Sequence, residues 1–420
     1  MFQKLKLLSL PAAYRKFFLF AFFTGAFICM DYAIVRPICT SVFLKAFGSS
    51  WYPYVWLTTI PLNVLCVGLY NSMIVRLGCL RTFLCFTSVV VSTHTIASMY
   101  LQMYPWLSFF YYAWKEVYVM LMLHQLWSVV QATFSMREAK FFYGILFAGG
   151  GLGGIVGSVI PGIFAVQIGS EQLLLLAIPI LPVAFFLYAQ MLKCTDQGLD
   201  YKLEVQERMH IGKAFMHGIS LIRSSRVLPL ILFVCVFMHL SMSFVEFQFG
   251  AALETTLQDQ DVRTQMLGRI FGLVQMVSLS LQLIGSFLLL QFLGLKRSFM
   301  LIPFLMGLHQ LAYVIFPTFG IAALLYGTQK VMHYSTFSVL KEMMYTPLQQ
   351  DEKFRAKAFI DVFVDRSAKA MGSLLILGCQ TLLMAHVHLW ISLFALFLFI
   401  AWYLVVKMRF NVLESNRPLV

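Results

Sequence analysis

The stretch KVMHYSTFSVLKEMMYTPLQQDEKFRAKAFIDVFVDRSAKAMGS, from Lys330 to Ser373, lies between two long apolar runs. It carries more charged residues than any other stretch of its length in the chain. An apolar chain keeps so much charge only where it meets water, a partner or a ligand. We therefore interpret the rest of the chain as a scaffold that places this stretch, and a few other charges, around a central pathway.

The composition of the whole chain predicts a membrane protein. The 420 residues are 60% hydrophobic and only 12% charged, and the mean hydropathy is +0.81. Soluble domains are about one quarter charged. A soluble fold is therefore excluded.

Apolar runs of about 20 residues, the length that crosses a bilayer as a helix, recur along the chain. The predicted fold class is an all-α membrane protein with twelve transmembrane helices. The first six are expected at 17–38, 52–73, 82–101, 107–133, 141–168 and 172–192. The other six are expected at 227–249, 269–293, 298–317, 319–340, 362–386 and 389–408.

The positions of the Lys and Arg residues predict the orientation of these helices. Connections assigned to the cytoplasm hold most of the 31 Lys and Arg residues, whereas those on the other side hold only Arg36, Lys45 and Arg263. Because cytoplasmic loops carry an excess of Lys and Arg, both termini are expected in the cytoplasm. The basic start of the chain lacks a signal-peptide cleavage site, which agrees with this orientation. The asymmetry also accounts for the net charge of +13, so no nucleic-acid partner is expected.

The longest polar connection divides the chain into two halves. It covers 193–226 and separates an N-terminal six-helix bundle (1–192) from a C-terminal one (227–420). Two such halves around a long cytoplasmic linker are typical of major-facilitator-type transporters. We expect a major-facilitator-like monomer in a lipid bilayer, with the halves rocking around a site near the middle of the membrane.

The ionisable residues inside the expected spans gather on helices 1, 4, 7 and 10. Such residues are costly in a membrane and usually functional. In the major-facilitator arrangement these four helices surround the central cavity, so the pattern predicts a polar pathway for a charged or strongly polar solute. The candidate substrate-binding residues are Arg36, Lys115, Glu116, Glu246, Lys330 and His333.

Structural ion pairs would also account for these charges. In that interpretation the charges hold helices together, and His333 is an ordinary buried histidine. His94, His124 and His309 show no metal-ligand spacing and are interpreted as packing residues. The pairs considered are Asp31 with Arg36, Lys115 with Glu116, and Lys330 with Glu246 or Glu116.

Four charged residues at the cytoplasmic end of helix 11 are candidates for a gate. Residues four apart on a helix share a face and can pair. We expect a salt-bridge network at the inner mouth, which acts either as a gate or as a fixed cluster joining helices 10 and 11. The residues are Asp361, Asp365, Arg366 and Lys369.

The glycine-rich run GGGLGGIVGSVIPG (149–162) lies inside an apolar segment with no preceding strand. It is a poor phosphate-binding loop and predicts close helix packing through small residues. The eight cysteines are scattered and form no CxxC motif, so neither a disulfide nor a metal site is expected. No nucleophile–base, Walker A or metalloprotease motif is present, so we expect no cofactor and no enzyme activity.

Three stretches resemble the ATP:ADP antiporter family of plastids and obligate intracellular bacteria. KEMMYTPLQQDEKFRAKAFIDVFVDRSAKAMGS (341–373) is similar to that family's K-E-M-x-Y-x-P-L, K-x-K-x-x-I-D-V and K-x-x-G-S motifs. LWSVVQATFSMREAKFFYG (126–144) resembles the family's helix 4 end, and DYAIVRP (31–37) resembles its helix 1. The first motif is specific, and together the stretches touch both halves.

This resemblance implies exchange of nucleotides, with ATP and ADP as the expected substrates, by alternating access in a bacterial inner membrane. Cavity Lys and Arg residues would meet the phosphates. Cys39 stands where the family has a basic residue, so a less charged nucleotide or another anion is also considered. The alternatives are a proton-coupled carrier of a non-nucleotide polar or anionic solute, and a non-transporting scaffold of the same fold.

Overall fold

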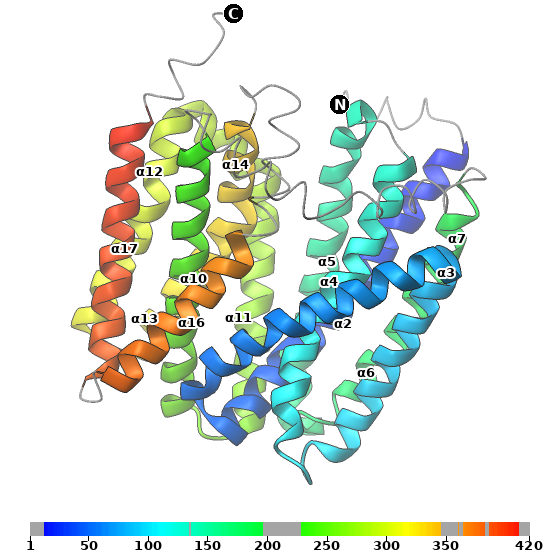
Figure 1. The fold of residues 1–420 in the computed structure, drawn as a ribbon, viewed down its shortest axis with the longest axis horizontal. Coiled ribbons are helices and arrows are strands. Elements are labelled where there is room, and N and C mark those ends of the chain that lie inside the picture. Colours follow the sequence, from blue (N-terminus) through cyan, green and yellow to red (C-terminus); the bar gives the residue numbers. More distant parts are fainter. Residues whose placement is uncertain are drawn as a thin grey trace, which may run out of the picture. The chain divides into compact units, whose positions relative to one another are not determined.

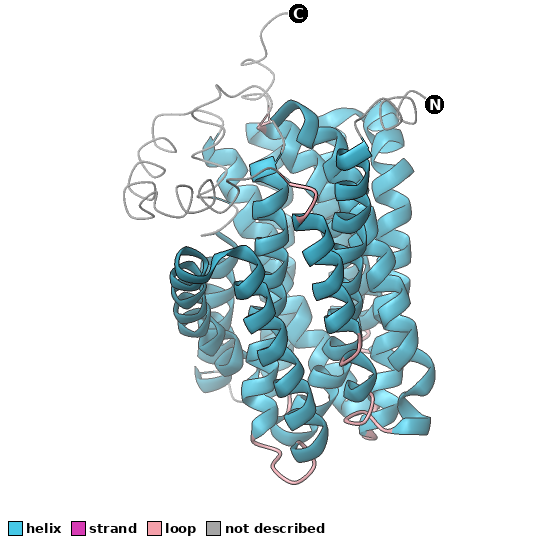
Figure 2. Ribbon diagram, turned by 90° about the vertical axis from the view of Figure 1, so that its right-hand side faces the viewer, coloured by secondary structure: helices cyan, strands magenta, loops and turns pink. Residues whose placement is uncertain are grey.

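The computed structural model describes residues 12–133, 136–195, 228–345, 360, 364–382 and 386–410. All regular structure in these residues is helical (Figure 2). Eight of the described helical segments are long and apolar enough to cross a membrane. The total of twelve spans and the cytoplasmic location of both termini stay predictions.

The helices follow the predicted spans closely (Figure 1). Helix α4 (Leu107–Thr133) has the predicted bounds. The other elements before the long connection are α2 (Ala12–Phe47), η1 (Ser49–Trp51), α3 (Tyr52–Tyr100), α5 (Met136–Ile168), α6 (Leu174–Ala177) and α7 (Ile180–Leu192). Those after it are α10 (Leu228–Thr256), α11 (Gln260–Ser280), η2 (Leu281–Gly285), α12 (Ser286–Ile315), α13 (Phe319–Met332), η3 (His333–Phe337), α14 (Ser338–Met344), α16 (Asp365–Leu382) and α17 (Val387–Arg409).

Two glycines separate predicted spans that the structure joins into one continuous element. Gly78 in α3 has φ 73° and ψ 175°, and Gly294 in α12 has φ 73° and ψ 170°. Residues with a Cβ rarely adopt this conformation, whereas glycine adopts it readily. Helix α3 changes direction along its length (Figure 1). Each glycine therefore marks the connection between two consecutive predicted spans.

The sequence around these glycines occurs twice. LGCLRTF covers 77–83 and LGLKRSF covers 293–299. Phe83 and Phe299 are fully buried, as are the hydroxyl residues before them. A shared sequence with a shared backbone conformation indicates an internal repeat, and two repeated halves are found in many transporters.

The described elements belong to two compact units. Unit 1 comprises Met1–Phe47, Pro61–Met209 and Asp259–Met276. In it, α2 packs against α4, α5 and α7. Unit 2 comprises Gly48–Ile60, His210–Gln258 and Val277–Val420, and in it α10 packs against α13, α16 and α17. The predicted division at 193–226 stays a prediction, because 196–226 lies outside the described residues.

The glycine-rich run forms the contact between α2 and α5 in unit 1. A Cβ at Gly153 would overlap the backbone carbonyl of Ala26, and one at Gly157 would overlap the carbonyl of Met30. Glycines at this four-residue spacing lie on one helix face and let two backbones approach closely. The predicted close packing is confirmed.

The start of α11 corrects one prediction. The span was expected at 269–293, but the helix begins at Gln260. Asp259 Oδ1 accepts hydrogen bonds from the N–H groups of Asp261 and Val262, both at 2.9 Å, and so caps the helix. Arg263, assigned to an outer connection, lies in this helix and is buried. The first turns of α11 are polar, so hydropathy alone did not predict that the helix begins at Gln260.

Candidate functional site

A lysine and a glutamate form the centre of a polar cluster in unit 1, which we call the Lys115 cluster. Lys115 is buried on α4, and its Nζ donates to Glu116 Oε1 at 2.6 Å. The same Nζ lies 3.6 Å from the centre of the Tyr112 ring. The hydroxyl of Tyr32 on α2 donates to Glu116 Oε1 at 3.4 Å. The predicted Lys115–Glu116 pair is therefore present, and an aromatic face adds cation–π attraction to it.

Arg36 contacts two aromatic rings. Its guanidinium carbon lies 4.2 Å from the centre of the Phe271 ring on α11 and 6.0 Å from that of Tyr32. Arg36 is half-buried. A guanidinium over a ring keeps its hydrogen-bond donors directed outward, where they can bind an anion.

Asp31 corrects one prediction and rules out one of the ion pairs that were considered. It does not pair with Arg36. Its carboxylate lies 3.2 Å from His94 Nε2 and accepts a hydrogen bond from the Tyr118 hydroxyl at 2.8 Å. The Tyr111 hydroxyl lies 3.0 Å from His94 Nδ1. His94 is therefore part of a buried polar network, not only a packing residue. The 63 residues between Asp31 and His94 gave no local sign of this contact.

Replacing Asp31 with alanine is expected to destabilise the protein by about 3 kcal/mol, because it leaves a buried hydroxyl and a buried imidazole without their acceptor. Asp31→Asn keeps an acceptor oxygen and should cost about half as much. Thermal unfolding of the purified protein in detergent measures both. Equal melting temperatures for wild type and Asp31→Ala would show that this network does not stabilise the fold.

Unit 2 holds a second lysine–glutamate pair, which we call the Lys330 cluster. Lys330 on α13 is buried, and its Nζ lies 3.4 Å from Glu246 Oε2 on α10. The ring of Tyr326 lies 5.4 Å from this Nζ and stacks on Phe249 at 4.3 Å. Gln329 Nε2 donates to Ser241 Oγ at 2.9 Å and joins the same two helices. Of the two pairings considered as an alternative to a substrate role for Lys330, the one with Glu246 is present.

His333 lies one turn after Lys330, at the start of η3. Its ring centre is 5.3 Å from that of His239 on α10, with the planes 79° apart. Its ring also stacks on Phe337 at 6.1 Å. His239 was not among the predicted residues, since a single histidine in an apolar helix carries no sequence motif.

Four polar residues of unit 1 have counterparts at a constant spacing. Each of these four is followed 215 residues later by a residue of the same or similar chemistry. Gly78 and Gly294 are 216 residues apart, which is nearly the same spacing. The polar residues and the glycines therefore support the same internal repeat. The same spacing, between His94 and His309, is the sequence signal that could have identified His94 as a candidate residue. The pairs are Asp31 and Glu246, His94 and His309, Tyr111 and Tyr326, and Lys115 and Lys330.

Most of the predicted gate cannot be compared with the structure. Asp361 lies outside the described residues, as do the side chains of Asp365 and Arg366 on α16. Lys369 is half-buried, and its Nζ lies 5.4 Å from the centre of the Trp56 ring. A salt-bridge network at this position stays a prediction.

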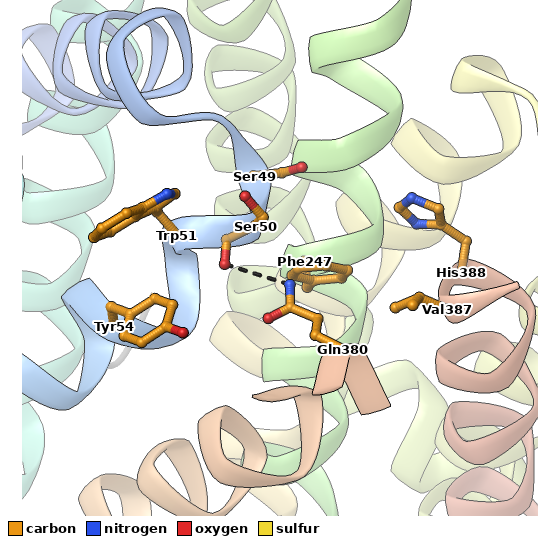
Figure 3. A pocket seen from close by; sticks show the side chains of 8 residues that line it. All are labelled: Ser49, Ser50, Trp51, Tyr54, Phe247, Gln380, Val387 and His388. Carbon is orange, nitrogen blue, oxygen red and sulfur yellow. Dashed lines mark hydrogen bonds between the residues drawn. The ribbon is translucent and has the colours of Figure 1, made fainter. Parts of the chain in front are cut away.

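A cavity of about 590 Å³ lies in unit 2, and none of the predicted site residues lines it (Figure 3). Two pairs of rings flank it: Trp51 with Tyr54, 5.1 Å apart, and Phe247 with His388, 6.2 Å apart. Gln380 Nε2 donates to the Ser50 carbonyl at 3.3 Å. None of the lining residues is Asp, Glu, Lys or Arg, so the cavity does not suit a phosphate group. Among the described residues, no cluster of three or more His, Cys, Asp or Glu side chains could hold a metal ion.

Apolar membrane-crossing helices that carry buried lysine–glutamate pairs are typical of membrane proteins with a functional polar site. Solved transporter structures share the fold. A peptide transporter POT in complex with sulfate matches with a TM-score of 0.63 at 10% identity, covering 98% of this chain and 99% of that one. The nucleoside transporter NupG (D323A mutant) matches with a TM-score of 0.63 at 12% identity, covering 92% and 100%. A POT family transporter in complex with 5-aminolevulinic acid matches with a TM-score of 0.61 at 11% identity, covering 96% of each chain.

The chain belongs to the TLC ATP/ADP transporter family, whose model matches residues 94–411. This match confirms the resemblance found in the motifs. No curated protein matches the chain. The protein is therefore a multi-pass membrane transporter.

Proposed function

We propose that the protein exchanges nucleotides, ATP and ADP or closely related ones, across a bacterial inner membrane by alternating access. The observation that supports this most directly is the presence of a buried membrane lysine in each unit, Lys115 and Lys330. A buried ammonium group is costly unless it has a partner or binds an anion. The family of the chain adds the expectation that the anion is a nucleotide.

The roles proposed for the side chains follow from their pairing. Lys115, Lys330 and Arg36 bind phosphate oxygens. Glu116 and Glu246 neutralise the two lysines while the site is empty, and they turn to the ribose, the base or a proton when phosphate replaces them. The Glu116 side chain is 30% exposed and that of Glu246 is 21% exposed, so a ligand can reach both pairs. A polyphosphate offers more negative charge than one carboxylate, which favours the exchange of partners.

Twelve spans in two six-helix halves, cytoplasmic termini and a monomeric state complete this proposal. The four-residue gate on helix 11 belongs to it as well. The structural match with the POT transporter supports the architecture in this proposal, because it covers 98% of this chain and 99% of that one.

Counter-exchange in proteoliposomes tests the proposal. Purified protein is reconstituted with or without unlabelled ATP inside, and uptake of labelled ATP, ADP and other nucleotides is followed. We expect uptake that requires internal nucleotide and does not respond to an imposed pH gradient. Absence of uptake for every nucleotide under every preload would refute the nucleotide assignment.

A proton-coupled carrier is the second candidate, because Asp31 and His94 form a fully buried titratable pair. Such a pair can hold a proton inside the membrane. In that case a pH jump, without internal nucleotide, would drive uptake of a polar or anionic solute. The same liposomes distinguish the two candidates.

A further inference from the structure

His239 and His333 form a contact between α10 and η3 that the roles above do not use. Their ring centres are 5.3 Å apart in an edge-to-face arrangement. Both side chains are half-buried. Inside a membrane, ionisable side chains face the bundle interior or a water-filled path and avoid lipid. We therefore expect the exposed part of this pair to face a polar path and not lipid.

The backbone is irregular at this place. His333 is the first residue of the π-helical turn η3, and η3 contacts a second π-helical turn, η2. Such turns are rare, occur mostly as single bulges in helices, and are frequent at functional sites. A π-helical turn shifts the residues after it around the helix axis, so it changes how the side chains after His333 face relative to those before it.

The internal repeat shows that the histidine pair is not part of the shared framework. At the spacing of 215 residues, His239 and His333 correspond to Thr24 and Tyr118. Thr24 bonds to the Phe20 carbonyl of its own helix, and Tyr118 donates to Asp31. Neither replaces an imidazole. The second half thus carries two imidazoles where the first half has a threonine and a tyrosine.

The pair lies next to the Lys330 cluster on the same two helices. His333 follows Lys330 by three residues, and His239 precedes Glu246 by seven. At 1.5 Å per residue these steps are about 5 and 10 Å. Because Glu246 neutralises Lys330, this region attracts an anion only weakly unless another positive charge is present. Protonated imidazoles supply that charge.

We propose that His239 and His333 form a second phosphate-binding point beside Lys330, and that it acts when the rings are protonated. This inference rests on the proposed nucleotide exchange and names the contact that makes it depend on pH. A protonated imidazole donates from both ring nitrogens, whereas a neutral one donates from one only. A phosphate therefore binds more tightly to the protonated pair than to the neutral one.

Other titratable and charged groups lie on the elements packed around the pair. Helix α17, which packs on α10, brings none between His388 and Tyr403. Those that the remaining packed elements bring, among the described side chains, are Cys235, Glu246 and Glu254 on α10, Tyr326 and Lys330 on α13, Tyr334 on η3, Lys296, Arg297, His309 and Tyr313 on α12, Lys341 and Glu342 on α14, and Lys369 and Cys379 on α16.

The test measures the KM for labelled ATP in exchange at pH 6 and pH 8. In wild type, KM at pH 6 should be roughly tenfold lower than at pH 8, because two charge-assisted hydrogen bonds are gained. His239→Gln should reduce this ratio to about threefold or less. His239→Lys should give a low KM at both pH values. The titration of ATP itself is common to all variants, so their difference isolates the protein.

His124→Gln is the matched control, because His124 is exposed on α4 and contacts Tyr70. It should keep the wild-type ratio. An unchanged ratio in His239→Gln overturns the inference while leaving nucleotide exchange intact. If no nucleotide is exchanged, thermal stabilisation by inorganic pyrophosphate in detergent decides the matter. Stabilisation that is larger at pH 6 and lost in His239→Gln supports the site, and stabilisation equal in both proteins, or absent, refutes it.

Discussion

Replacing Lys330 with alanine is expected to lower nucleotide exchange roughly a hundredfold, which corresponds to about 3 kcal/mol. The ammonium group is buried and lies 3.4 Å from Glu246, so its loss removes the proposed phosphate contact and the lysine counter-ion of Glu246. The remaining carboxylate also repels the phosphates. Uptake of labelled ATP into nucleotide-loaded proteoliposomes measures the effect, with reconstituted protein quantified in each sample.

Two further variants separate binding from folding. Lys330→Met combined with Glu246→Gln removes both charges, so no unpaired charge remains, and it should restore the melting temperature but not the exchange. Lys193→Ala, at the end of α7, removes an exposed lysine and should exchange as wild type does. Normal exchange by Lys330→Ala would place phosphate binding elsewhere.

Replacing Gly153 with alanine is expected to destabilise unit 1 by about 3 kcal/mol or more. The added Cβ would overlap the backbone of Ala26, so no side-chain rotation can relieve the contact and α2 must move away from α5. Because α2 also packs on α4 and α7, this movement disturbs the whole unit. A lower melting temperature in detergent and a smaller monodisperse fraction on size exclusion would show the effect.

Gly144 provides a control with the same chemical change on the same helix. No atom lies within 4 Å of a Cβ built there. Gly144→Ala should therefore be neutral or stabilise the helix by up to about 1 kcal/mol, because alanine favours a helix over glycine. If both alanine variants melt alike, the glycine run does not determine the packing of α2 on α5.

The sequence predicted the helices well because a membrane imposes length and hydropathy directly. The bounds of α4 and the small-residue packing of α5 follow from these two properties. The start of α11 was missed, since Gln260–Arg263 are polar and looked like a loop. Only the capping carboxylate of Asp259 and burial against other helices make these residues helical.

The candidate residues were predicted better than their partners. Charges in apolar spans are rare, so Lys115, Glu246 and Lys330 stood out without any structure. Partners are set by contacts between helices far apart in sequence, and hydropathy has no information on them. The partner considered for Asp31 was therefore Arg36, five residues away in the sequence. In the structure Asp31 contacts His94 and Tyr118.

The neutrality of the two lysine–glutamate pairs has an electrical consequence. A pair with no net charge feels almost no net force from the voltage across the membrane, so Lys115–Glu116 and Lys330–Glu246 add little electrical work when the empty protein changes conformation. Moving one elementary charge through the membrane costs or yields about 2.3 kcal/mol for each 100 mV. In an exchange of ATP for ADP, the voltage then acts mainly on the one extra negative charge of ATP. The membrane voltage, with the concentrations of the two nucleotides, would set the direction of net exchange.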